Sequence, residues 1–263
     1  MSSLYRSILN VQGGVDADAQ AFITAASITD PTQQSAINQL VVDLKGYGVW
    51  SKMKALYPFV GGTASSHKFN LKDPQDTDAA FRLVFNGGWT HSSNGAQPNG
   101  TNGYADTKLI PLSVLTSVSG SFGIGLKTNI EESKVDIGVN GTNAGWFRLY
   151  SRYAGNLTYW TYGDGYPSGI PYSNTNSIGM WYVVRNGAVN TDLYKNGSLL
   201  NSSPQTVTLP NRSIFVGAIS NLGTAALFSS KEINFAFVGN GLNASEISNF
   251  NTTISNFQTA INR

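Results

Sequence analysis

Aromatic side chains and short polar ones are concentrated between residues 146 and 172. Sugar rings stack their C–H faces on tryptophan and tyrosine, and their hydroxyl groups need amide, carboxylate and backbone partners. Alternation along a strand places Tyr159 on one face and Trp160 and Tyr162 on the other. One face belongs to the core, and the other faces solvent or a partner. Packing is therefore the alternative for each candidate glycan-binding residue: Trp146, Tyr159, Trp160, Tyr162, Asp164 and Tyr166.

Carboxyl groups are not arranged for bond cleavage. Hydrolysis of a glycosidic bond needs two of them, one as acid and one as nucleophile or base, held a few ångströms apart. Glu131 and Glu132 are adjacent and would point to opposite faces of a strand, which indicates a solvated turn. Asp73, Asp76 and Asp78 follow one another in a loop, where turn and cap roles are favoured over a metal site.

The remaining reactive residue types give no stronger signal. His67 and His91 have no serine or carboxylate spaced as in a catalytic triad. Asp164 lies in a Gly-Asp-Gly turn and is one candidate calcium ligand, but isolated Asp-Gly turns are common. The chain has no cysteine, which excludes disulfides and thiolate chemistry. We therefore predict no catalytic residues, no metal site and no cofactor.

Charge and hydropathy exclude two classes of partner. The 263 residues include 17 basic and 15 acidic ones, with a formal net charge of +2 and no run of lysine or arginine. Nucleic-acid binding through phosphate neutralisation would require a clustered basic patch. The apolar runs are too short to cross a bilayer, and the first ten residues lack the apolar core of a signal peptide. We expect no nucleic-acid partner and no membrane span.

Residues 177–201 carry the clearest hairpin signals. Asn186-Gly187 and Asn196-Gly197 each separate short runs of aromatic and β-branched residues. A two-residue type I′ turn needs positive φ at both positions, which glycine and asparagine tolerate best. Similar runs recur through the central chain, and we expect strands at 68–71, 81–85, 105–109, 122–127, 135–139, 146–150, 157–162, 180–184, 192–194, 213–218 and 233–238. Many short strands without long intervening helices predict an antiparallel β-sandwich.

Helices are expected at both ends of the chain. Asp30 followed by Pro31 is typical of a helix start, and apolar residues follow at helical spacing until Gly46. A further turn or two is expected through Trp50 and Met53. The helices of residues 16–56 are too few to form their own core, so they should cover one face or end of the sandwich, with Trp50 as a plug.

The C-terminal helix has a reciprocal cap and one apolar stripe. Asn243 and Glu246 stand three residues apart at its start. Its apolar residues repeat at spacings of three and four: Ile247, Phe250, Ile254, Phe257 and Ile261. The other faces carry serine, asparagine and threonine instead of paired charges. Packing on the parent domain is the favoured interpretation, and a trimer seam is the alternative.

Several segments resemble a known class of module. The hairpin sequence WYVVRNG, followed by LYKNGSLL, resembles the hairpin signature of laminin-G-like and concanavalin-like jelly rolls. The segment FNGGWTHSSNGAQPNGTNGYADT at 85–107 is similar to an entry strand of that fold. Together with residues 16–62 and 229–263, these segments resemble a lectin-like module of structural and fibre proteins from tailed bacteriophages. The likeness runs from residue 15 to 263 and is weakest at 113–173.

The resemblance implies a non-enzymatic virion protein. A head fibre or capsid-surface decoration protein is the leading form, with a lectin-like face for host glycans and other virion proteins as partners. A polysaccharide-cleaving glycosidase or depolymerase on the same fold, and a tail-fibre adhesin, are the alternatives. The expected divisions are an arm at 1–15, a helical segment at 16–56, the sandwich at 57–240 and the final helix at 241–263.

The N-terminal arm carries more apolar residues than a solvated tail usually does. It either folds back on its own domain or docks on a neighbouring subunit or virion protein. The candidate assembly residues in this arm are Leu4, Tyr5, Ile8 and Leu9.

Overall fold

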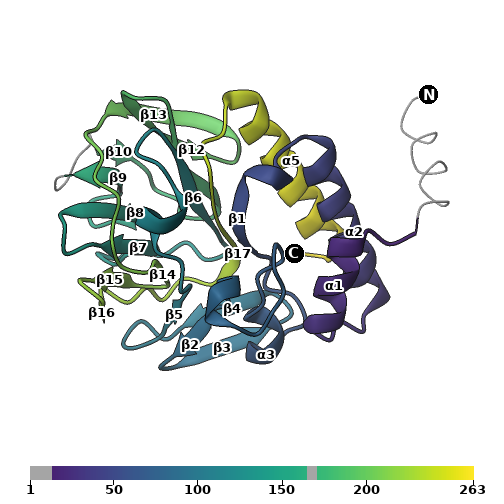
Figure 1. Cartoon of the computed structure of the whole chain (residues 1–263). Coiled ribbons are helices and arrows are strands. Elements are labelled where there is room, and N and C mark those ends of the chain that lie inside the picture. The colour runs from purple at the N-terminus through teal and green to yellow at the C-terminus, as the bar shows by residue number, and fades with distance from the viewer. Residues whose placement is uncertain (1–13, 165–170) are drawn as a thin grey trace.

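The computed structural model describes residues 14–164 and 171–263, in which two sheets pack face to face and helices cover one side (Figure 1). This architecture confirms the predicted mainly β sandwich with N-terminal helices and a C-terminal helix. No helix within the described ranges is both long and apolar enough to span a membrane. Five predicted site residues lie outside the described ranges: Leu4, Tyr5, Ile8, Leu9 and Tyr166.

The first sheet has the strand order β13-β12-β11-β6-β17-β4-β3, and β1 also pairs with β17. Its strands are β1 (Met53–Tyr57), β3 (Trp89–Ser92), β4 (Gly95–Pro98), β6 (Ser119–Leu126), β11 (Gly179–Asn186), β12 (Asn190–Lys195), β13 (Ser198–Pro204) and β17 (Ile233–Gly239). The register pairs Leu126 with Gly179 on one side and with Ile233 on the other. The end of β6 and the starts of β11 and β17 therefore meet at one margin of the sheet.

The second sheet has the order β10-β9-β8-β7-β14-β5-β2. Its strands are β2 (Val84–Asn86), β5 (Tyr104–Asp106), β7 (Ile137–Asn140), β8 (Gly145–Tyr153), β9 (Leu157–Asp164), β10 (Tyr172–Ser173) and β14 (Phe215–Val216). A small hairpin of β15 (Ile219–Asn221) and β16 (Thr224–Ala226) joins it through a parallel pairing with β7.

Two apolar cores share the first sheet. On β11, Trp181 and Val183 point between the two sheets, whereas Met180, Tyr182 and Val184 point toward the helices. All five side chains are buried. Burial on both faces explains why this strand is apolar at successive positions instead of alternating with polar residues.

The helical layer consists of α1 (Ala17–Ala25), α2 (Pro31–Gly46) and α5 (Ala244–Ala260), which lie together against the first sheet (Figure 1). Asp30 caps α2 by accepting the backbone N–H of Thr32 at 2.8 Å, with Pro31 at the first helical position. Trp50 belongs to the core beneath these helices. The prediction that they cover one face of the sandwich is confirmed. The short helices are η1 (Trp50–Lys52), α3 (Ala64–His67), η2 (Asp78–Ala80) and α4 (Pro111–Val114).

The apolar stripe of α5 packs within the chain. Asn243 and Glu246 form the expected capping box, with Glu246 N–H donating to Asn243 Oδ1 at 2.9 Å. Ile247, Phe250 and Phe257 are buried in the core that α5 shares with α2 and the first sheet. This confirms packing on the parent domain, and the stripe is not free to form a trimer seam.

Four local expectations are wrong. No strand forms at 68–71, where Lys68 caps the end of α3 and Asn70 makes only an isolated bridge to Asp73. Met53 begins strand β1 instead of continuing a helical turn, because this segment pairs with β17. Phe81 has a φ of 58° and terminates η2, so the strand expected at 81–85 starts only at Val84. The loop after Asn186 has three residues because β12 begins at Asn190, so this hairpin lacks the two-residue type I′ turn.

Candidate functional site

Two of the predicted glycan-binding aromatic residues lie inside the sandwich. Trp160 is 2% exposed and Tyr162 is fully buried, and both belong to the core between the sheets. The Tyr162 hydroxyl donates to the backbone carbonyl of Thr116 at 3.0 Å. These two side chains are the packing set of β9, and their burial leaves no surface for a ligand.

Trp146 and Tyr159 lie on the opposite face of the second sheet, and Asp164 ends strand β9. The Arg148 guanidinium stacks on the half-buried Trp146, 4.3 Å from the ring centroid. Tyr159 is half-buried and packs edge-on against Tyr153 at a centroid distance of 5.2 Å. Asp164 accepts the backbone N–H of Thr208 at 2.8 Å. Trp146, Tyr159 and Asp164 therefore stay predictions, as does Tyr166.

The acidic loop after β1 is held by cations of the chain itself. Hydrogen bonds from Lys68 and Arg82 lower the pKa of the Asp76 carboxyl group, despite the opposing effect of desolvation. Arg82 also pairs with Asp78 at 3.1 Å. Across the described ranges, no three His, Cys, Asp or Glu side chains gather in a metal-binding group.

The adjacent glutamates have different surroundings, so the interpretation as a solvated turn is wrong for one of them. Glu131 is exposed and pairs with Arg152 at 3.3 Å. Glu132 is half-buried and pairs at 3.0 Å with Lys231, which is fully buried. The sequence could not indicate this contact because the two residues are 99 positions apart.

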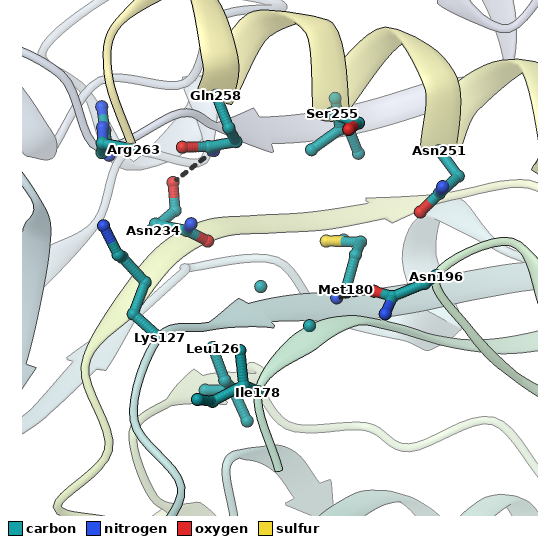
Figure 2. Close-up of a pocket in the computed structure, with 13 residues that line it drawn as sticks. Leu126, Lys127, Ile178, Met180, Asn196, Asn234, Asn251, Ser255, Gln258 and Arg263 are labelled. Atoms are coloured by element: carbon teal, nitrogen blue, oxygen red, sulfur yellow. Dashed lines mark hydrogen bonds between the residues drawn. The ribbon is translucent and has the colours of Figure 1, made fainter. Parts of the chain in front are cut away.

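A pocket of about 470 Å³ lies between α5 and the margin of the first sheet where β6, β11 and β17 meet (Figure 2). This volume is within the roughly 300–1,000 Å³ typical of small-molecule sites. We call it the α5 pocket, and define it by its lining residues: Gly125, Leu126, Lys127, Ile178, Gly179, Met180, Asn196, Asn234, Asn251, Ile254, Ser255, Gln258 and Arg263.

Local structure explains why the α5 pocket is open and why the side formed by α5 is polar. Gly125 lies in the floor, where an added Cβ would stand 2.3 Å from Asn234 Oδ1. On α5, Asn251, Ser255 and Gln258 recur at helical spacing, so one face of the helix presents two amides and a hydroxyl to the pocket. Aliphatic side chains and Met180 lie between these groups, so the described lining is mixed polar and apolar, without an aromatic ring.

Several polar groups of the α5 pocket have unused hydrogen-bonding capacity. The Nε2 of Gln258 donates to the backbone carbonyl of Asn234 at 3.4 Å, whereas its buried Oε1 has no partner within the described chain (Figure 2). Asn196 Oδ1 accepts the Met180 N–H at 2.8 Å, and Asn251 Oδ1 accepts the Tyr182 hydroxyl at 3.1 Å. Both oxygens are used within the chain, and the two amide nitrogens remain as donors for a ligand.

Two cations give the α5 pocket a positive character. Lys127 follows the end of β6, and no ion pair is formed by its ammonium group with a described residue. Burial lowers the pKa of Arg263 to about 10, although Glu232 acts in the opposite direction. The Arg263 guanidinium donates to the carbonyls of Asn94 and Phe59, and its buried Nε has no partner in the described part of the chain.

The lining of the α5 pocket can form hydrogen bonds to a polar ligand, but it does not contain the two carboxyl side chains that a glycosidase needs. Its described lining contains amides, a hydroxyl, two cations and apolar side chains, without an acidic side chain. Sequence reasoning did not find this site because its residues come from five separate segments. The signal available was the row Asn251, Ser255 and Gln258, which lies beside the apolar stripe of the same helix.

Solved structures that align with this chain include a sialidase, a botulinum neurotoxin and an arabinanase domain. A Trypanosoma rangeli sialidase in complex with 2,3-difluorosialic acid aligns with a TM-score of 0.52 and 12% identity, over 83% of this chain and 38% of that one. A botulinum neurotoxin type C structure, described as depending on two ganglioside molecules for cell entry, aligns with a TM-score of 0.52 and 11% identity, over 79% of this chain and 52% of that one. Domain 4 of the arabinanase AbnA from Geobacillus stearothermophilus aligns with a TM-score of 0.48 and 15% identity, over 76% and 98% of the two chains.

At these identities the likeness shows the β-sandwich fold alone. This chain spans about 38% of the sialidase and 52% of the toxin chain. Comparisons with known protein families and with curated proteins find no match.

Proposed function

We propose that this chain is a non-enzymatic glycan-binding protein and that the α5 pocket is its binding site. The observation that carries the proposal is the set of polar groups around the pocket with unused capacity, above all the buried Oε1 of Gln258 and Nε of Arg263. A buried polar atom without a partner costs free energy, and a bound hydroxyl group or water would remove that cost. The toxin structure whose description names gangliosides has the same fold, which is consistent with this role.

The expected ligand is an acidic saccharide, such as a sialylated or uronic-acid-containing oligosaccharide. The side chains of Lys127 and Arg263 place two positive charges at the α5 pocket, and its described lining has no acidic side chain. A sugar carboxylate would accept charge-assisted hydrogen bonds from these cations, which are stronger than neutral ones. Its hydroxyl groups would pair with the amides of Asn234 and Gln258.

Binding without cleavage follows from the chemistry of the lining. A glycosidase needs two carboxyl groups about 5–10 Å apart across the scissile bond. The amides and cations of the α5 pocket can orient a sugar but cannot supply that pair. A depolymerase on this fold, the alternative from the sequence, would have to use residues elsewhere.

The finer proposal is a bacteriophage virion component, either a head fibre or a capsid-surface decoration protein that presents this glycan-binding site to the host. It rests on the sequence resemblance described above. Other virion proteins would then be its partners, and the arm residues Leu4, Tyr5, Ile8 and Leu9 would contribute to assembly. A tail-fibre adhesin is the alternative placement.

Binding and turnover can be measured in one experiment. The purified chain is applied to a glycan array that contains matched acidic and neutral oligosaccharides, and each ligand that binds is then incubated with it and analysed by mass spectrometry. We expect binding to acidic glycans that are recovered intact. Cleaved products would contradict the non-enzymatic assignment, and an array without any binding would contradict the glycan-binding function.

The virion assignment needs a separate measurement. Proteomic analysis of purified phage particles, combined with antibody labelling in electron micrographs, should locate the chain at the capsid surface. Its absence from intact particles would refute the virion role and leave glycan binding to be judged from the array.

A further inference from the structure

A buried cluster of one amine and two carboxyl groups joins the two sheets, away from the α5 pocket. Lys231 precedes β17 in the first sheet, and Asp136 precedes β7 in the second. Both side chains are fully buried, and Lys231 Nζ lies 3.0 Å from Asp136 Oδ1. Lys231 Nζ also lies 3.0 Å from Oε1 of Glu132, whose side chain is 13% exposed.

The two oxygens of Asp136 have different partners. Oδ2 accepts the backbone N–H of Ser151 at 2.7 Å. Oδ1 faces the Lys231 amine and also accepts from the Ser229 hydroxyl at 3.0 Å. Oδ2 is therefore held by the backbone. Oδ1 lies beside the Lys231 amine and the Ser229 hydroxyl group, which can transfer a proton to it.

A path for that proton is present. Ser229 Oγ lies 2.7 Å from Glu132 Oε1 and 3.0 Å from Asp136 Oδ1, so it bridges the two carboxyl groups. Glu132 touches the Lys231 ammonium and can take its proton, and Ser229 can pass a proton on to Asp136. The carboxylates raise the pKa of Lys231 against the effect of its burial, so the amine is charged at rest and must lose a proton before it reacts.

We propose that Lys231 and Asp136 condense into an intramolecular isopeptide bond. Lys231 Nζ, after giving one proton to Glu132, attacks Cγ of Asp136. The C–Oδ1 bond then breaks, Oδ1 leaves as water with the two protons released from the amine, and Oδ2 remains as the amide oxygen held by Ser151. An ammonium and a carboxylate contain the atoms and charges of one amide and one water, so no oxidant or other reactant is needed.

Burial favours this condensation in two ways. It excludes the water that would drive the reverse reaction, and it disfavours the charged pair relative to a neutral amide. Because the resting amine is charged, we expect the reaction to follow folding slowly. The bond would connect residues 95 positions apart and cross-link the two sheets.

Intact-mass spectrometry of the folded chain tests the proposal. The expected result is a mass about 18 Da below that of the sequence, reached over hours after folding, through the loss of one water. Tandem spectra of a tryptic digest should show a branched peptide that joins Lys231 to Asp136. A folded protein that keeps its full mass after prolonged incubation would overturn the proposal, as would a water loss that maps to another position.

Variants distinguish the roles of the neighbouring groups. Glu132→Gln keeps the side-chain shape but cannot accept the proton, and it should slow the mass change at least tenfold. Glu131→Gln, on the adjacent exposed residue, should react like the wild type. Lys231→Arg retains the positive charge and should show no mass loss. Equal rates for Glu132→Gln and the wild type would contradict the assigned role of Glu132.

Discussion

His67 and His91 form an imidazole pair at the edge of the sandwich. Their Nδ1 atoms are 2.9 Å apart, so one ring must donate and the other accept. His67 is 1% exposed, and burial, together with His91 and Arg263, lowers its pKa to about 3. Burial also lowers the pKa of His91. The folded chain therefore holds this pair neutral at pH values where an unfolded histidine is charged.

The pair should make stability depend on pH. Unfolded histidine titrates near pH 6.5, so below that pH the side chain is protonated in the unfolded state. In the folded state His67 stays neutral down to about pH 3. Stability is thus highest above about pH 6.5 and falls as the pH decreases toward 3. Between pH 7 and pH 5 the contribution of His67 is a loss of about 2 kcal/mol.

Urea unfolding of His67→Gln checks this expectation, because the variant should lose about 2 kcal/mol less than the wild type between pH 7 and pH 5. His91→Gln, on the more exposed partner, should show a smaller change in the same direction. A His67→Gln variant with the pH dependence of the wild type would refute the buried neutral state.

At the residue scale, the sequence predicts types of environment better than individual roles. Alternation along the strand separated Tyr159 from Trp160 and Tyr162. In the structure Trp160 and Tyr162 are buried, and Tyr159 is half-buried. Which face is the inner one depends on where the second sheet lies. Sequence spacing alone does not contain that information.

The Asn196-Gly197 turn is an element that serves both fold and site. Its φ values of 50° and 79° confirm the two-residue turn expected between β12 and β13. The same turn places Asn196 in the α5 pocket, where its Oδ1 accepts the N–H of Met180. Residues that tolerate positive φ at positions 196 and 197 are therefore required both for the hairpin and for the position of Asn196 in the α5 pocket.

Replacing Gly197 with alanine should destabilise the chain by about 1–2 kcal/mol, because an L-residue is strained at positive φ. The new Cβ would also stand 3.2 Å from Asn251 Cβ, across the pocket rim. Chemical denaturation measures the change. The matched control is Gly46→Ala in α2, where an added Cβ meets nothing within 4 Å and should stabilise by up to about 1 kcal/mol. Equal stability of Gly197→Ala and the wild type would contradict the turn geometry.

Elements with strong local signals were predictable, and those defined by distant partners were not. The caps of α2 and α5 and the apolar run of β11 are encoded within a few residues. Strand β1 forms because its backbone pairs with β17, which lies about 180 residues later in the chain. Strands β3 and β4 are rich in small and polar residues, so their hairpin has little strand propensity of its own.

At the scale of the whole molecule, the first sheet is the shared wall of two cores. One core fills the sandwich, and the other lies beneath α1, α2 and α5. The α5 pocket opens where the helical layer passes the margin of that sheet (Figure 2). The fold class followed from strand patterning, whereas the site depends on how a C-terminal helix docks on strands from the middle of the chain.

The measurement that tests the central claim most directly is a calorimetric titration of the folded chain with the acidic oligosaccharide that binds best on the array. Wild type, Lys127→Gln and Lys54→Gln are titrated side by side. Lys54 is a half-buried lysine on β1 that does not line the α5 pocket, which makes it the control.

The account predicts that Lys127→Gln weakens the affinity about tenfold or more, because one charge-assisted hydrogen bond is lost, with Lys54→Gln unchanged. Equal affinities for all three proteins would contradict the assignment of the α5 pocket as the glycan-binding site.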